Sequence, residues 1–233
     1  MTYVMSDLHG DYEKYQKMLE LIEFSDEDTL YVLGDIVDRG PEPIRILYDM
    51  SMRPNIIPMM GNHEHMAEDI LRMTNVEITE ASLASNWNTE TVYKIHQWYE
   101  NGGYSTAKDF HRLTLDDREY ILDYLREFTF YEEVRVGDND FLLVHAGLPE
   151  FSPEKEIEDY SEILMLYAPT DYTKTYYPDR YLVTGHTPTF MIDPAYDGKI
   201  YRKNGHIAMD CGVCHGKALG CLCLDDFREF YIN

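Results

Sequence analysis

Five short polar motifs follow one another along the chain, and their side chains are of the types that bind divalent metals. In chain order they are SDLHG at 6–10, GDIVDRG at 34–40, GNHE at 61–64, VHAG at 144–147 and GHT at 185–187. They offer carboxylate, amide and imidazole donors without thiolate, a set that suits Mn, Fe, Zn or Mg better than a structural zinc cage. We expect one pocket in which six side chains converge on metal: Asp7, His9, Asp35, Asn62, His145 and His186.

An apolar, strand-like run precedes each motif. The runs are 3–5, 30–33, 56–60, 141–144 and 181–183. Each motif therefore falls at the carboxyl end of a buried strand, where open α/β sheets form their sites. In Asp7-x-His9 we expect both side chains on one face of an extended segment, because side chains alternate along a strand.

Helical periodicity between these runs predicts βα units. Apolar spacing indicates a helix over 11–24, a second helix opening at Pro41 and a third near 64–73. The segment from about 74 to 128 is helical in pattern, with a break at 101–103 and Thr114 as a candidate N-cap. We expect this segment to be a helical insertion beside the sheets.

After residue 128 the pattern changes to a period of two. Residues 129–136 and 141–145 flank a turn at 137–140, which predicts a hairpin, and short strands follow at 199–203, 206–210 and 218–224. We predict one α/β domain over residues 1–233, a four-layer αββα sandwich of two mixed sheets with helices outside and the helical insertion at about 74–128.

Length and composition bound the class of protein. The 233 residues fit one domain, and the formal net charge of −23 disfavours broad nucleic-acid binding. No apolar run approaches the roughly 20 residues that a membrane span needs. A strand that begins by Tyr3 leaves no room for a signal peptide, and the four cysteines cluster within 211–223 rather than forming a disulfide framework. We expect a cytoplasmic enzyme without a membrane partner, whose cysteines are structural thiols.

Taken together, the motifs resemble those of the calcineurin-like metallophosphoesterases. The forms GDIVDRG and GNHE, and the run IAMDCG at 207–212, are similar to the phosphoprotein phosphatase branch. Gly102-Gly103 and the short length are similar to the compact bacterial and phage serine/threonine phosphatases of that branch. The resemblance extends from Tyr3 to about Leu224. It implies two bound divalent metal ions, for which we expect Mn, with Fe, Zn or Mg as alternatives.

The resemblance also implies a role for each residue. One metal would be held by Asp7, His9 and Asp35, and the other by Asp35, Asn62, His145 and His186. His63 would be the general acid, Asp38 its hydrogen-bond partner, and Arg39, with Asn62, would bind phosphate oxygens. Two cations about 3.5–4 Å apart polarise a phosphoryl group and lower the pKa of a shared water toward 7, so that a bridging hydroxide attacks phosphorus in line.

One departure concerns a second phosphate-binding arginine. Relatives usually carry Leu-Leu-Trp-x-Arg between H-A-G and G-H-T, whereas this chain has EILMLY at 162–167. Arg180 is the candidate substrate-binding replacement; Lys174 is an alternative, or the contact is absent. The six tyrosines between 160 and 181 are explained either by loop packing or by an aromatic rim of the substrate cleft.

Three functions are compatible with these residues. We expect a metal-dependent phosphomonoesterase acting on phosphoserine or phosphothreonine, with a phosphoprotein or small phosphoester as its partner. The alternative within the same branch is a symmetrical bis(5'-nucleosyl)-tetraphosphatase, which cleaves diadenosine tetraphosphate. A catalytically weak metal- and phosphate-binding module is a further alternative, suggested by the missing arginine.

Overall fold

Two five-stranded mixed sheets form the centre of the computed structural model, which describes residues 1–76 and 88–233. The first sheet has the order β10-β9-β1-β2-β3 and the second β4-β5-β6-β8-β7. Strands of the first are β1 (Thr2–Met5), β2 (Thr29–Val32), β3 (Ile56–Pro58), β9 (Leu219–Cys223) and β10 (Glu229–Ile232). Strands of the second are β4 (Tyr131–Val136), β5 (Asn139–Val144), β6 (Arg180–Thr184), β7 (Tyr201–Lys203) and β8 (His206–Ala208). The prediction of two mixed sheets is confirmed.

The sheets pack against each other through alternate residues of their strands. Val4 and Leu222 of the first sheet share a fully buried cluster with Leu143 and Val183 of the second. Tyr3, the neighbour of Val4, points to the opposite face and packs in the cluster that the helices cover. The period of two along each buried strand therefore builds both an inner and an outer core.

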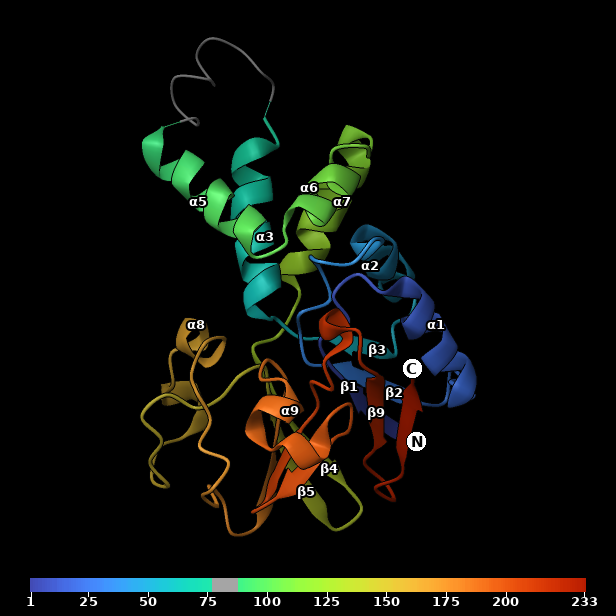
Figure 1. Cartoon of the computed structure of the whole chain (residues 1–233), viewed down its shortest axis with the longest axis vertical. Helices are drawn as coiled ribbons and strands as arrows, with labels where there is room; N and C mark the ends of the chain where they lie inside the picture. Colours follow the sequence, from blue (N-terminus) through green and yellow to red (C-terminus); the bar gives the residue numbers. More distant parts are fainter. Residues whose placement is uncertain (77–87) are drawn as a thin grey trace.

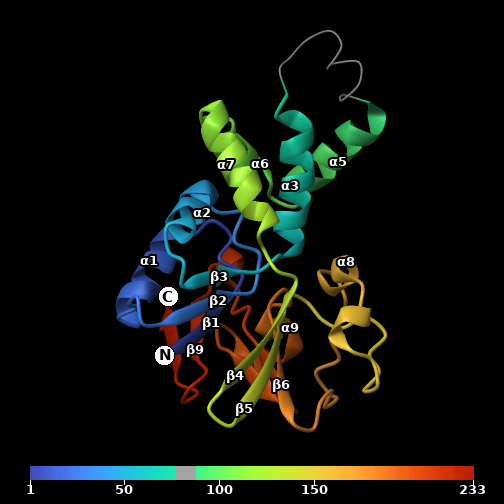
Figure 2. The same cartoon turned by 180° about the vertical axis from the view of Figure 1, so that it is seen from behind.

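Helices cover the outer face of the first sheet and extend beyond one end of it. Those before residue 77 are α1 (Tyr12–Leu21), α2 (Pro43–Ser51) and α3 (Asn62–Thr74); those after residue 87 are α5 (Thr89–Glu100), α6 (Tyr104–Phe110) and α7 (Leu115–Arg126). α3 and α5–α7 form a helical group at the end of the molecule opposite the β4–β5 hairpin (Figures 1 and 2). Thr114 caps α7, its side chain accepting a hydrogen bond from the Asp117 amide.

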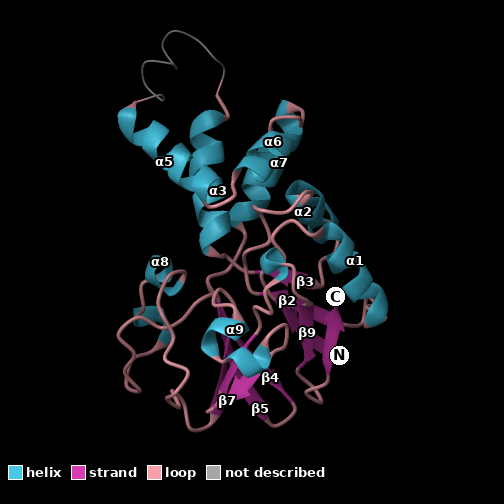
Figure 3. Cartoon of the chain, in the orientation of Figure 1, coloured by secondary structure: helices cyan, strands magenta, loops and turns pink. Residues whose placement is uncertain are grey.

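The outer face of the second sheet is covered mostly by loop. Short helices α8 (Glu162–Met165) and α9 (Thr189–Ile192) and the single 3₁₀ turns η1 (Ile157–Asp159) and η2 (Pro194–Tyr196) lie among the loops of 145–179 and 185–200 (Figure 3). A further 3₁₀ turn, η3 (Val213–His215), lies in the loop between β8 and β9. Leu148, Ile157 and Met165 pack there against Leu142 and Leu182.

Two differences from the sequence prediction concern α2 and β10. The second helix begins at Pro43 rather than Pro41, because the amides of Gly40 and Glu42 donate to His9 and Gly10 carbonyls and keep residues 40–42 in a loop. β10 was not predicted; it pairs antiparallel with β9 as an edge strand. Trp87 and the rest of 77–87 lie outside the described residues, so the bounds of the helical insertion, like the single-domain assignment, stay a prediction. Among the described helices, none is long and apolar enough to cross a membrane.

Candidate metal centre

The five motifs meet where β1, β2, β3, β5 and β6 end. The Asp7 amide donates to the Gly34 carbonyl at 3.1 Å, and the His9 amide donates to Asp35 at 2.9 Å. Across the two sheets, the His186 amide donates to the Asp7 carboxylate at 3.0 Å. Loops far apart in sequence are thus joined by backbone hydrogen bonds before any ligand is considered.

Oxygen and nitrogen atoms converge from four of these loops. His145 Nε2 lies 3.0 Å from Asn62 Oδ1 and 3.3 Å from Asp35 Oδ1. His186 Nδ1 lies 2.9 Å from Asn62 Oδ1 and 3.2 Å from His145 Nε2. Asp35, His145 and His186 form one group able to hold a metal ion, with ligand atoms all within 4.8 Å of one another.

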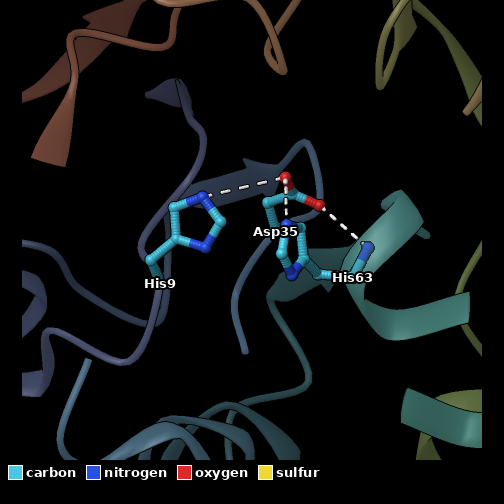
Figure 4. A group of neighbouring side chains, drawn as sticks. All are labelled: His9, Asp35 and His63. Carbon is cyan, nitrogen blue, oxygen red and sulfur yellow. Dashed lines mark hydrogen bonds and ion pairs between the residues drawn. The ribbon is translucent and has the colours of Figure 1, made fainter. Parts of the chain in front are cut away.

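Figure 4 shows a second group, formed by His9, Asp35 and His63. His9 Nε2 lies 3.8 Å from Asp35 Oδ2, and His63 Nε2 lies 3.9 Å from the same oxygen. Asp35 belongs to both groups, which is the position that a bridging carboxylate requires. Asp7 is buried next to them, but belongs to neither group; its carboxylate accepts from Ser6 Oγ at 2.5 Å and from the His186 amide.

The backbone fixes the tautomers of two histidines. A carbonyl oxygen only accepts, so His145 Nδ1 donates to Leu33 O at 2.6 Å, and His9 Nδ1 donates to Val37 O at 3.2 Å. In each neutral ring the lone pair is therefore on Nε2 and points into the centre. Burial lowers the pKa of His9 and of His145, and it lowers that of His186 to about 4, so the rings are neutral and ready to ligate.

Buried carboxylates give the centre an excess of negative charge. The pKa of Asp7 is raised by burial and then by Asp210; that of Asp35 is raised by burial, then by Asp7 and Glu64. Burial raises the pKa of Asp210 to about 6. Neutral imidazoles do not balance these charges, whereas divalent cations do. A cation would also satisfy His145 Nε2 and Asn62 Oδ1, which face each other as two acceptors. The donor set therefore fits bound metal.

His63 is held by a network that reaches into the helical group. Its Nδ1 lies 2.7 Å from Asp38 Oδ2, which also accepts from Trp98 Nε1 at 2.8 Å. Thr106 Oγ1 donates to the other carboxylate oxygen of Asp38 at 2.6 Å and accepts from the Asp38 amide. Trp98, Thr106 and Asp38 are almost fully buried. Sequence reasoning missed Trp98 and Thr106; the only local signal was their position on either side of the Gly102-Gly103 break.

Arg39 lies across the centre. One terminal nitrogen is 2.8 Å from His9 Nε2 and the other 3.1 Å from His63 Nε2. Behind the guanidinium, Nε donates to the Asn101 carbonyl at 3.4 Å, while the Arg39 amide donates to Gly102 at 3.0 Å. The turn between α5 and α6 thus presents the two terminal nitrogens of Arg39 to the metal-ligand side.

Left-handed backbone is concentrated at the centre. Of the ten non-glycine residues with positive φ in the described part, six are predicted site residues: Asp7, His9, Asp35, Asp38, Arg39 and His186. Such strain is typical of functional sites. It also corrects the expected geometry of Asp7-x-His9, because β1 ends at Met5 and φ is 56° at Asp7 and 44° at His9. A left-handed turn, and not strand alternation, places these two side chains.

The structure does not bring Arg180 to the centre. Arg180 begins β6 and forms an ion pair with Glu133 of β4, whereas His186 follows the far end of the same strand. A strand of this length separates its ends by roughly 15 Å, so the structure gives no support to the substrate-binding role predicted for Arg180. Lys174 is paired with Asp171 at 3.2 Å. Tyr167 follows Met165, whose carbonyl accepts from the amides of Ala146 and Gly147 directly after His145. Burial and then the charge of Asp35 raise the pKa of Tyr167.

Glu64 joins two of the motif loops. Its Oε2 accepts from the amides of Asp35 at 2.7 Å and Gly61 at 3.0 Å, and its Oε1 accepts from Ile36 at 2.7 Å and Val37 at 2.9 Å. The side chain is fully buried. Gly34 and Gly61 allow this approach: a Cβ at Gly34, where φ is +84°, would lie 2.5 Å from the Gly61 backbone.

Comparison with known proteins identifies the family of the chain and several curated relatives. Residues 2–190 match the model described as calcineurin-like phosphoesterase. The symmetrical bis(5'-nucleosyl)-tetraphosphatase of Acidovorax ebreus is 29% identical over 165 residues, 69% of this chain and 49% of that protein. The enzyme of the same name from Nitrosospira multiformis is 26% identical over 66% of this chain and 46% of its own. The chain spans about half the length of these curated relatives.

Two solved structures share the fold. A putative diadenosine tetraphosphatase superposes with a TM-score of 0.66 at 14% identity, over 99% of this chain and 92% of the other. A protein serine/threonine phosphatase from Saccharomyces cerevisiae gives 0.55 at 13% identity, over 94% and 71%. At these identities the likeness is one of fold.

Replacing Asp35 by Asn should remove the shared metal ligand. A neutral amide bridges two cations poorly, so we expect at most one metal ion per chain in elemental analysis of the purified Asp35→Asn protein. Asp138→Asn, in the exposed β4–β5 turn, is the matched control and should keep the metal content of the unaltered chain. Two ions retained by Asp35→Asn would remove Asp35 from the bridging position.

Replacing Glu64 by Gln should loosen the two loops. The amide NH₂ would face backbone N–H donors, and the loss of two charge-assisted hydrogen bonds lowers the free energy of unfolding by about 3 kcal/mol. Denaturant unfolding of the metal-free protein measures this, with the exposed Glu90→Gln as control. A loss no larger than that of the control would show that the loops hold without Glu64.

Proposed function

The chain belongs to the calcineurin-like phosphoesterase family, and on this premise we propose that it cleaves a dinucleoside tetraphosphate symmetrically, with two divalent metal ions as cofactors. The observation that carries the proposal is the sequence similarity to symmetrical bis(5'-nucleosyl)-tetraphosphatases, which extends over two thirds of this chain. Bond cleavage between the second and third phosphates would release two nucleoside diphosphates. This was the alternative from the sequence; the protein phosphatase activity expected first is supported only by fold.

The donor atoms divide between two metal positions that share Asp35. His9 and Asp35, with Asp7 next to them, would hold one ion, and Asp35, Asn62, His145 and His186 the other. Such ions supply polarisation of a phosphoryl oxygen and activation of water when bound. Oxygen and imidazole donors suit Mn, and also Fe, Zn and Mg.

Arg39 would bind the phosphate that is attacked. Its planar fork matches two phosphate oxygens, and the α5–α6 turn already holds its Nε side. In the described structure its terminal nitrogens donate to His9 and His63, two contacts that a phosphate would replace. With Arg180 and Lys174 paired elsewhere, Arg39 is the arginine that faces the centre in the described chain.

His63 would give a proton to the leaving oxygen. Asp38 accepts from Nδ1 and so directs Nε2 toward the centre, while Trp98 and Thr106 fix the orientation of the Asp38 carboxylate. A donor of this kind matters most for an alkoxide leaving group, which is why phosphoserine and phosphothreonine remain the second candidate substrates. A phosphate leaving group depends on it less.

Product analysis tests the proposal directly. Protein loaded with Mn should convert diadenosine tetraphosphate to ADP alone, without AMP or ATP, and should turn it over faster than phosphoserine peptides. Asp35→Asn, purified in parallel, controls for contaminating hydrolases. Release of AMP together with ATP would exclude symmetrical cleavage. Hydrolysis of phosphopeptides without hydrolysis of diadenosine tetraphosphate would favour the second candidate.

Proton donation by His63 predicts a dependence on the leaving group. His63→Asn should slow hydrolysis of an alkyl phosphate by about 10² or more, the usual share of general acid catalysis, and para-nitrophenyl phosphate by much less, with metal content unchanged. Equal losses on both substrates would contradict the role.

Trp98→Phe keeps an aromatic ring but removes the N–H that Asp38 accepts. We expect a smaller loss with the same leaving-group dependence, measured as kcat on the same two phosphates. Tyr99→Phe, next to it on α5 and partly exposed, is the matched control and should behave like the unaltered chain.

A further inference from the structure

A groove extends away from the metal centre along the outer face of the second sheet. It consists of two cavities of about 370 and 730 Å³, which share Leu148, Glu150 and Pro169 among their lining residues. Tyr167 and Leu164 line the smaller cavity, and Phe151 and Tyr176 line the larger. We call the two together the 148–176 groove. Each volume is within the range of small-molecule sites.

The smaller cavity adjoins the metal centre. Leu148 follows His145 by three residues on the same loop, and that loop is held by Thr170, whose hydroxyl donates to Ala146 at 2.9 Å. The amides of Ala146 and Gly147 both donate to the Met165 carbonyl, two residues before Tyr167. The electrostatic effect of Asp35 on Tyr167 agrees with this placement. A molecule that has a phosphate at the metals can therefore reach the groove directly.

Charge in the groove excludes a phosphate chain as its occupant. Its acidic side chains are Glu150 and Asp171, and its one basic side chain, Lys174, is paired with Asp171. Glu150 lines both cavities, is exposed, and its carboxylate makes no hydrogen bond or ion pair with any residue of the described chain. A free acceptor above an apolar and aromatic lining suits a flat, uncharged group that carries N–H donors.

Resting on the proposed function, we propose that the 148–176 groove binds one nucleoside of the substrate, a purine whose base stacks on Tyr167 and whose exocyclic amine donates to Glu150. The tetraphosphate chain of the molecule lies at the metals and Arg39. Both explanations of the tyrosines in 160–181 then apply, to different residues: Tyr167 and Tyr176 line the groove, whereas Tyr160 and Tyr172 are buried in packing.

Two variants test the groove without touching the metal ligands. Tyr167→Ala and Glu150→Ala should each raise KM for diadenosine tetraphosphate, Tyr167→Ala by about tenfold, as expected for loss of one stacked base. Neither should change kcat or KM for para-nitrophenyl phosphate, which carries no base. Tyr93→Ala, at an exposed tyrosine of α5, is the matched control. An unchanged KM for the tetraphosphate in both variants would overturn the groove as a nucleoside site, and the proposed function would stand.

Binding of adenosine separates the groove from the reaction. Adenosine has no phosphate for the metals, so titration of the unaltered protein, followed by NMR or calorimetry, should show binding that Tyr167→Ala abolishes. If diadenosine tetraphosphate is not hydrolysed, the proposed function fails, and this titration still decides the groove. No binding of adenosine to the unaltered chain, or binding equal in Tyr167→Ala, would overturn the proposal.

Discussion

The arrangement of the metal centre depends on one buried carboxylate. Glu64 accepts hydrogen bonds from four backbone amides, three in the loop after β2 and one at the start of α3. Burying a charge is costly unless it is compensated, and here four donors compensate it. Because Glu64 also belongs to the first turn of α3, the same contact fixes Asn62 and His63 relative to Asp35. The left-handed residues of the loop after β2 can persist because these bonds hold them there.

A second constraint is electrostatic. The chain has a net charge of −23, and its centre adds buried carboxylates to neutral histidines. An anionic phosphate would be repelled by this arrangement if the protein acted alone. Divalent cations reverse the sign locally, and Arg39, held by the α5–α6 turn, adds a further positive group that faces them. The centre therefore attracts phosphate only as a metal complex, whereas the acidic groove beside it suits an uncharged part of the substrate.

The sequence predicted what is local and periodic. The buried strands and the polar motifs that follow them predicted the sheets and the six candidate ligands. They could be predicted because an apolar run and a turn are each determined by residues a few positions apart. What it did not predict depends on partners distant in the chain. Trp98 and Thr106 act on Asp38 only because α5 and α6 pack over the loop after β2. Arg180 has the charge that phosphate binding needs. The sheet, however, places it at the end of β6 opposite His186, where it pairs with Glu133. Glu64 did carry a local signal, an acid three residues after a glycine at a helix start, which is typical of capping.

The division between sheet and loop also bears on how substrate is chosen. The strand ends and the Glu64 contact fix the metal donors, and Arg39 and His63 lie beside these donors. Two segments outside the sheets flank the centre. The helical group orients Asp38 and Arg39, and residues 148–176 cover the second sheet mostly with loop. Loops on a rigid sheet can change without moving the reacting atoms. If the 148–176 groove binds a nucleoside as proposed, a change in the groove would alter which group attached to the phosphate is accepted, and it would leave the metal donors in place.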